Sequence, residues 1–221
     1  MNVTTGSPWG GHALTLNLPA LKIRFHGLSR SQCKEIAASY VGFVAHEAAS
    51  ADVDCNVYRL KTPPALSIAE LSLGGQYAPK KTRNEFMDCL DVTGTNFEAK
   101  FTLGSSGRSS LGVSNEKELA SANVIENYLR IIAAHRVLKQ RGVILHSAGL
   151  VFNEKAYIFA GRSNAGKTTL TRKAHKKGAR VLSDDINLVL PGNGGYDAYA
   201  VPFTGEFGRI LDHAGGKAHL A

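Results

Sequence analysis

Apolar and polar residues alternate in two short runs near the start of the chain, Leu14 to Leu18 and Leu21 to Phe25, with Pro19 between them. An alternation with a period of two is typical of strands that bury one face. Residues 57–60 and 97–103 give weaker signals of the same kind among loops rich in Gly, Ser, Lys and Pro. The pattern predicts strands at all four places.

Helical spacing follows the first two strands. Ser29 and Gln32 stand three residues apart, as in a capping box, and Ile36, Tyr40 and Phe43 then recur at intervals of three or four residues. This pattern predicts one amphipathic helix that begins at Ser29 and continues past Phe43.

A second helix is predicted to begin near Ser114 and to end before Gly142. Its first turn is acidic, with Glu116 and Glu118, and its last turn is basic, so both ends suit the helix dipole. Apolar residues recur at helical spacing between them: Ile125, Leu129 and Ile132.

The segment 104–110 consists of small residues apart from Arg108. It suits either a linker between domains or a long hairpin loop, and the sequence leaves both interpretations open. A chain of 221 residues can form two modest domains. We expect a smaller N-terminal α/β region over residues 1–110, which reveals no chemistry, and a second domain over residues 111–221.

The second half of the chain begins with β-type runs at 142–146 and 149–152, a turn at 153–155 and the apolar run 156–159. Immediately afterwards, residues 161–168 match the phosphate-loop pattern G-x-x-x-x-G-K-[ST] in full, between a predicted strand and a predicted helix. The alternative, a glycine turn before an ordinary helix, does not account for the complete match.

In such a loop the backbone N–H groups and the lysine bind phosphate oxygens, and the following hydroxyl can bind Mg²⁺. The motif therefore predicts binding of ATP with Mg²⁺. The predicted nucleotide-binding residues are Gly161, Arg162, Ser163, Asn164, Ala165, Gly166, Lys167, Thr168 and Thr169.

Asp184 and Asp185 end the next predicted strand, about 17 residues after Lys167. A pair of acids at a strand end is often a solvated turn, but phosphoryl transfer needs one carboxylate near the metal and another near the acceptor hydroxyl. His146 and Glu206 are weak candidates when considered alone, since a lone histidine at a strand end is more often structural.

Considered together, four segments resemble the catalytic domain of HPr kinase/phosphorylase and its relatives, which include kinases associated with peptide-modifying gene clusters. The segments are 146–149, 161–168, 181–185 and 202–206, and the resemblance covers about residues 120–210. It implies an α+β or α/β domain of the HPr kinase and phosphoenolpyruvate carboxykinase type, with a mixed, largely antiparallel sheet flanked by helices.

The resemblance also implies roles for single residues. Lys167 would bind the phosphates, His146 would lie beside them, and Asp185 would take the proton from the acceptor hydroxyl. The implied metal ligands are Thr168, Asp184 and Glu206.

The implied activity is that of a serine/threonine-type kinase that passes the γ-phosphate of ATP to a small protein or peptide, HPr-like or a modified peptide. Two alternatives stay open: a small-molecule kinase, and a nucleotide-binding regulatory module without phosphotransfer. Related kinases continue well beyond the segment of Glu206, whereas this chain stops at Ala221. We therefore expect a truncated or degenerate member, and, by resemblance, a homo-oligomer.

Charge and composition narrow the list of partners. The formal charge of +8 favours anionic partners, but the basic residues are scattered apart from 80–83 and 172–177, which predicts solvated faces and no nucleic-acid surface. With no signal-peptide pattern and no apolar run of about 18 residues, we expect a cytoplasmic protein without a membrane partner. Three cysteines are expected to be reduced thiols: Cys33, Cys55 and Cys89.

Overall fold

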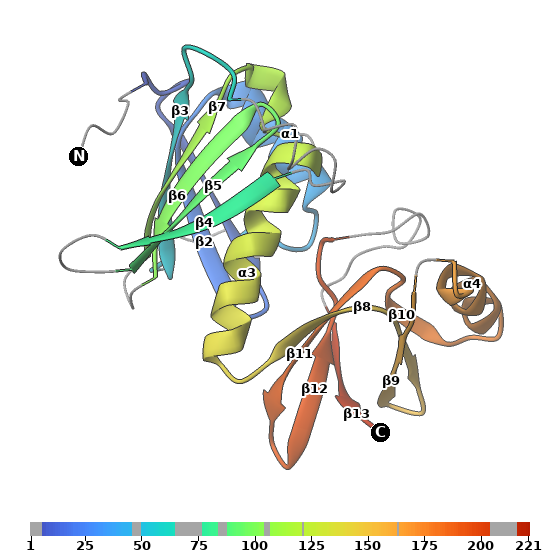
Figure 1. Ribbon diagram of the computed structural model, residues 1–221. Helices are drawn as coiled ribbons and strands as arrows, with labels where there is room; N and C mark the ends of the chain where they lie inside the picture. Colours follow the sequence, from blue (N-terminus) through green and yellow to red (C-terminus); the bar gives the residue numbers. More distant parts are fainter. Residues whose placement is uncertain are drawn as a thin grey trace. The chain divides into compact units, whose positions relative to one another are not determined.

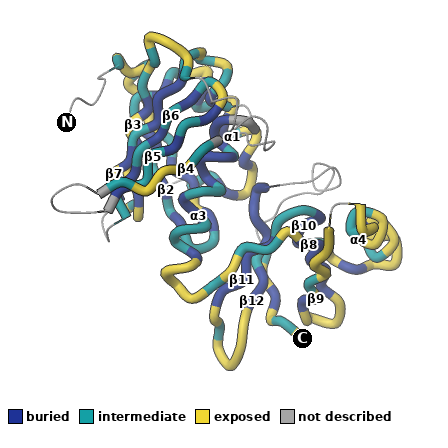
Figure 2. Tube along the Cα trace, in the orientation of Figure 1, coloured by how far each residue is buried: buried dark blue, intermediate teal, exposed yellow. Residues whose placement is uncertain are grey.

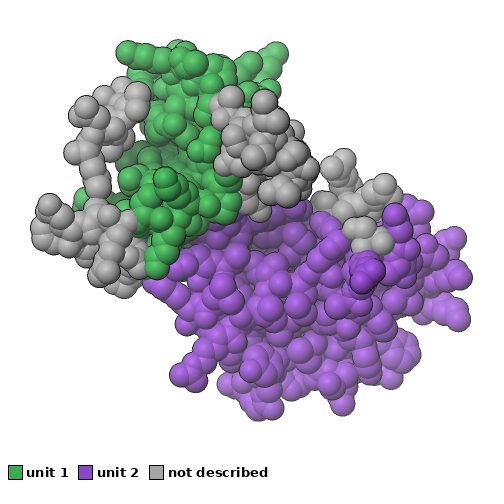
Figure 3. Space-filling model, viewed as in Figure 1, with its two compact units in different colours: residues 1–17, 21–40, 44–129 green, residues 18–20, 41–43, 130–221 purple. Residues whose placement is uncertain are grey.

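The computed structural model describes residues 6–45, 50–64, 77–83, 88–103, 107–120, 122–162, 164–203 and 216–221. The chain divides into two compact units (Figure 3). Unit 1 takes residues 1–17, 21–40 and 44–129, and unit 2 takes residues 18–20, 41–43 and 130–221. The described chain contains both strands and helices, which confirms the prediction of mixed α and β content.

Unit 1 is built on a seven-stranded sheet (Figure 1). In spatial order its strands are β1 (His12–Leu18), β2 (Leu21–Leu28), β3 (Val53–Arg59), β7 (Gly107–Val113), β6 (Phe97–Thr102), β5 (Asp88–Gly94) and β4 (Tyr77–Arg83). Strand β3 pairs in parallel with β2 and β7, and β7, β6, β5 and β4 pair antiparallel in succession. The four strands predicted in this half of the chain are all present.

The alternation in β2 shows why this segment forms a strand. Leu21, Ile23 and Phe25 are almost fully buried, while the residues between them stay partly exposed. Burying one face of a strand removes alternate side chains from water, which supplies most of the favourable free energy.

Helix α1 (Arg30–Ser39) has the predicted capping box: the Gln32 backbone donates to Ser29 Oγ, and the Ser29 backbone donates to Gln32 Oε1. The helix ends earlier than predicted, because Tyr40 is already its C-cap residue. Phe43 therefore lies in the turn that follows and is buried there, not on the helix.

The hairpin interpretation of 104–110 is the correct one. β6 and β7 are antiparallel neighbours, and residues 107–110 belong to β7; residues 104–106 lie outside the described residues. Because β7 is a central strand of the first sheet, the boundary between units falls near residue 129 and not at 110. The N-terminal unit is consequently the larger one, not the smaller one that we expected.

The second predicted helix is not continuous. A short 3-10 helix at Glu116–Glu118 and a π-helical turn at Ala122–Glu126 precede helix α3 (Asn127–Lys139). The two acidic residues belong to the 3-10 helix, whose N-cap Asn115 accepts a hydrogen bond from the Lys117 backbone. The predicted C-terminal end of α3 is confirmed.

Unit 2 holds a six-stranded sheet and helix α4 (Lys167–Lys176). The strands are β8 (Val143–Phe152), β9 (Lys155–Ala160), β10 (Arg180–Ser183), β11 (Ile186–Gly192), β12 (Gly195–Tyr199) and β13 (Lys217–Leu220). All pairings are antiparallel except that of β13 with β9, so the sheet is mixed and largely antiparallel, as expected. The runs at 142–146 and 149–152 form the single strand β8.

The core of unit 2 lies on one face of these strands, as their register shows, and the buried stretches of the strands are dark blue in Figure 2. Its buried members are mostly small or β-branched residues: Val151, Ala156, Leu182, Val189, Ala198, Ala200 and Ala218.

The three cysteines are free, as predicted, and Cys55 and Cys89 are buried. Burial raises the pKa of the Cys55 thiol to about 12, which keeps it protonated and unreactive. Among the helices of the described ranges, none combines the length and apolarity that a membrane span requires.

An ion-pair cluster attaches the C-terminal strand β13 to β12. Asp197 on β12 accepts from Lys217 Nζ at 2.9 Å and lies 3.1 Å from His219 Nδ1. The hydrogen bond from Lys217, and then that from His219, holds the pKa of Asp197 below its ordinary value. A depressed folded-state pKa means that the carboxylate adds stability above the unfolded-state pKa of about 3.9, and that this stability is lost at lower pH.

We predict that Ser29→Ala lowers the free energy of unfolding of unit 1 by about 1 kcal/mol, because one backbone donor of α1 loses its acceptor. Urea denaturation measures the effect. Ser31→Ala is the matched control, since Ser31 Oγ donates to the exposed Glu35 side chain, and it should change stability by less than about 0.5 kcal/mol. Equal losses in the two variants would contradict the capping role.

We predict that Asp197→Asn lowers the melting temperature at about pH 6 and that the difference from the wild type shrinks at about pH 3, where the wild-type carboxylate is also becoming protonated. Thermal unfolding followed by circular dichroism measures both. Asp54→Asn serves as the control, because the His26–Asp54 pair is largely exposed and should contribute little. A deficit that stays constant down to about pH 3 would exclude a contribution of charge.

Candidate functional site

The predicted phosphate loop connects β9 to α4, as the motif requires. Ala160 is the last residue of β9, and α4 starts at Lys167 after Gly166, which has a φ of 84° and serves as N-cap. A left-handed conformation of this kind is open to glycine at little cost. Within the described residues no side chain caps α4, so its first backbone N–H groups are oriented as an anion site needs. Ser163 lies outside the described residues.

Lys167 is folded over its own loop. Its Nζ donates to the carbonyl oxygens of Gly161 and Arg162, each at 2.9 Å. An ammonium group has three N–H donors, and these two bonds use two of them. The lysine is therefore held beside the loop with one donor that can meet a phosphate oxygen.

The two acids lie where the chain passes from β10 to β11. β11 pairs with β8 up to Ile186 opposite His146, and β10 pairs with the same edge of β8 from Ser183 opposite Gly149. Asp184 and Asp185 form the turn that joins β10 to β11 across this gap. The sequence predicted the acids at a strand end but not the shared edge that positions them.

Hydrogen bonds fix this turn, where the regular pairing with β8 is interrupted. Ser183 Oγ accepts from the backbone N–H groups of Asp185 and Ile186, each at 3.2 Å. The Ser147 backbone N–H of β8 donates to the Asp185 carbonyl at 2.8 Å. The acid pair is thus tied to β8 through its backbone, which leaves the carboxylates available for other contacts.

Ser147 also connects the turn to the phosphate loop. On its other edge β8 pairs with β9, and there Ser147 lies opposite Ala160, the residue before Gly161. Adjacent strands are about 4.8 Å apart. The start of the loop and the acidic turn therefore lie about two strand spacings apart, on the two sides of a single residue of β8.

The side chain of Asn187 also holds Ser147 in place. It is fully buried, and Nδ2 donates to the Ser147 carbonyl at 2.7 Å and to Ser147 Oγ at 3.1 Å. The amide fits only because residue 149 is glycine: a Cβ there would stand 2.1 Å from Asn187 Oδ1. Sequence reasoning missed Asn187, although a single amide inside the apolar run 186–190 was a usable signal.

Asp185 lies between two cationic or potentially cationic side chains. Its carboxylate is 3.1 Å from His146 Nε2 and 3.4 Å from Arg130 on α3. The Arg130 guanidinium also lies over the ring of the buried Phe203, 5.6 Å from its centroid. The structure thus brings two of the predicted site residues, His146 and Asp185, into contact, which the sequence had not predicted. Arg130 was missed because nothing in its helix distinguished it.

Asp184 is turned to the other side, toward α4. Its side chain is buried, and Oδ2 lies 3.5 Å from Thr168 Oγ1, a long distance for a direct hydrogen bond. A hydroxyl and a carboxylate oxygen placed side by side are suitable ligands for Mg²⁺, which commonly takes one or two protein oxygens and completes its shell with phosphate and water. The predicted metal ligands Thr168 and Asp184 therefore fit the ion; Glu206 lies outside the described residues.

The described part of the chain gathers no three His, Cys, Asp or Glu side chains at one point. About a third of the Asp185 side chain and half of the His146 side chain are exposed, so both can meet a ligand.

Comparisons with known proteins add nothing to this geometry: no family model, curated protein or solved structure matches the chain.

We predict that Asn187→Ala lowers the free energy of unfolding of unit 2 by about 1–3 kcal/mol, because the buried Ser147 carbonyl loses its donor. Chemical denaturation measures the loss. Asn56→Ala, at an exposed position of β3, is the control and should change stability by less than about 0.5 kcal/mol. If Asn187→Ala leaves the free energy of unfolding unchanged, the acidic turn does not depend on this amide.

Proposed function

We propose that the chain binds ATP with Mg²⁺ and acts as a kinase of the HPr-kinase-like type, with a Ser or Thr hydroxyl of a small protein or peptide as the acceptor. The observation that carries this proposal is the position of Ser147, which pairs with the end of β9 on one edge of β8 and with the Asp184–Asp185 turn on the other. A phosphate loop and two carboxylates at this separation are the parts that phosphoryl transfer needs.

In this proposal each residue has a limited task. The N–H groups at the start of α4 and the Lys167 ammonium bind phosphate oxygens, while Thr168 and Asp184 hold Mg²⁺. The metal ion, when bound, neutralises charge on the phosphates. Asp185 accepts the proton of the attacking hydroxyl, and its contacts with His146 and Arg130 orient the carboxylate.

Two variants separate binding from transfer. Lys167→Ala should weaken Mg²⁺-dependent ATP binding at least about tenfold in calorimetry, because a charge-assisted contact with phosphate is lost. Asp185→Asn should keep ATP affinity within a few-fold and lower kcat by about a hundredfold or more, as the loss of a general base does.

Transfer is followed with γ-labelled ATP, a library of Ser- and Thr-containing peptides, and purified HPr. Lys34→Ala, at an exposed position of α1, is the control and should leave ATP binding and turnover unchanged. Wild-type affinity in Lys167→Ala would refute the loop as the phosphate site. Binding without transfer to any acceptor would instead favour a nucleotide-binding regulatory module, and transfer to small hydroxyl compounds alone a small-molecule kinase.

A further inference from the structure

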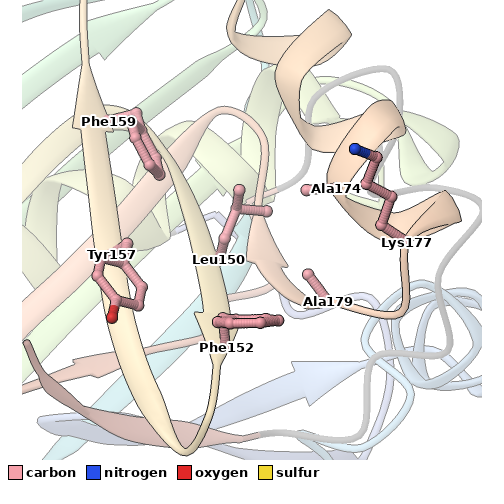
Figure 4. A pocket seen from close by; sticks show the side chains of 7 residues that line it. All are labelled: Leu150, Phe152, Tyr157, Phe159, Ala174, Lys177 and Ala179. Atoms are coloured by element: carbon pink, nitrogen blue, oxygen red, sulfur yellow. The ribbon is translucent and has the colours of Figure 1, made fainter.

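The outer face of the β8–β9 hairpin, opposite the core of unit 2, carries an apolar pocket (Figure 4). In Figure 4 the labelled side chains come from β8, from β9, from α4 at Ala174, and from the segment just after α4 at Lys177 and Ala179. The pocket has a volume of about 280 Å³. Its lining residues are Leu150, Phe152, Tyr157, Phe159, Ala174, Lys177 and Ala179.

The aromatic side chains of this pocket are unusually exposed. Phe152 is 55% exposed, Phe159 42% and Tyr157 39%, and Leu170 extends the apolar surface one turn earlier on α4, at 37%. Single exposed apolar residues need no explanation, but a contiguous group of them marks a binding surface. The fold itself gives no reason for three large rings here, because the hairpin buries its other face in the core.

The surroundings of the pocket are strongly basic. Helix α4 after its first residue and the segment that follows it, residues 168–180, contain five Lys or Arg and no acid. Lys177 lines the pocket itself, and Lys173 lies one turn before it on α4. An apolar hollow with a cationic rim is complementary to an apolar side chain flanked by carboxylates.

The purine base of ATP is a poor fit for this pocket. A base presents donors and acceptors around its edge, and its recognition needs a few polar partners, whereas the lining is aliphatic and aromatic apart from Lys177 and the hydroxyl of Tyr157. Ala174 and Lys177 also follow Lys167 by seven and ten residues, which places them about 10–15 Å along α4 from its phosphate end.

We propose that this pocket is a docking site for an acidic segment of the phosphoryl acceptor, which inserts one aromatic or branched aliphatic side chain between β9 and α4. The identification of the partner as the acceptor rests on the proposed function, whereas the recognition of an acidic peptide does not. Docking at one end of α4 anchors the partner near the phosphate loop at the other end, and so raises the local concentration of its hydroxyl.

A phage-displayed library of random peptides, selected on the full chain, tests the chemistry of the occupant. Selected peptides should share one Phe, Trp, Leu or Ile next to Asp or Glu. Labelled copies should bind the wild type in fluorescence anisotropy, and added NaCl should weaken the binding because the rim is charged.

Variants locate the binding. Ala174→Trp fills the pocket, and Tyr157→Ser removes an exposed ring without disturbing the core; each should weaken peptide binding about tenfold. The double variant Lys173→Glu and Lys177→Glu should weaken it by a similar factor. Tyr196→Ser is the matched control, since Tyr196 is an aromatic residue on β12 that is 49% exposed and lies outside the pocket; it should change the Kd less than about twofold.

Calorimetry with ATP separates this proposal from the proposed function. All pocket variants should bind ATP with wild-type affinity; a parallel loss of ATP affinity would identify the pocket as a base site and overturn the docking proposal. Selected peptides without acidic residues, or peptides that bind all variants equally, would also overturn it. A third result would overturn it too: no peptide is selected, the wild type binds phosphatidylserine vesicles, and the pocket variants lose that binding. If peptides bind the pocket but ATP is never turned over, the kinase proposal fails and the docking site stands.

Discussion

The candidate site depends on one constraint: strands β10 and β11 share a single edge of β8. The chain passes from β10 to β11 within two residues, Asp184 and Asp185. Where the ladder is interrupted, Ser147, Ser183 and Asn187 supply the missing hydrogen-bond partners. A buried backbone group without a hydrogen-bond partner costs about 1–3 kcal/mol, so this two-residue turn has few alternative conformations. The two carboxylates then point to different neighbours, Thr168 and His146, because consecutive side chains leave the backbone in different directions.

The same strand determines where the phosphate loop begins. β9 runs along the opposite edge of β8, and its last residue, Ala160, stands opposite Ser147. A change in the register of β9 by one residue would displace the loop from the acids and would also turn the apolar side chains of the hairpin to the wrong face. The core contacts of Ala156 and Val151 therefore help to position a loop in which neither residue takes part.

Much of the fold follows from local patterns in the sequence. The alternation at residues 14–18 and 21–25 predicted β1 and β2, the Ser29–Gln32 spacing predicted the start of α1, and the motif at 161–168 predicted a strand, a loop and a helix in that order. These predictions succeed because period, capping and turn chemistry act over a few residues. The predictions for the end of α1, for an unbroken second helix and for the boundary between units were wrong. Each of these features depends on partners far away in the chain. Strand β7, for example, becomes a central strand only by pairing with β3 and β6.

The sequence by itself determined the chemical components of the site: a loop with Lys167 and Thr168, a pair of adjacent acids, and a histidine at residue 146. It also determined the resemblance that suggested roles for them, because such motifs consist of residue types at fixed spacing. Only the tertiary structure decided that Asp185 meets His146 and Arg130, that Asp184 lies beside Thr168, and that an apolar pocket stands at the other end of α4. The physical reason is that strand pairing and helix packing bring together residues 40 to 55 positions apart. Neither the shared edge of β8 nor the space beside α4 has any local signature in the chain.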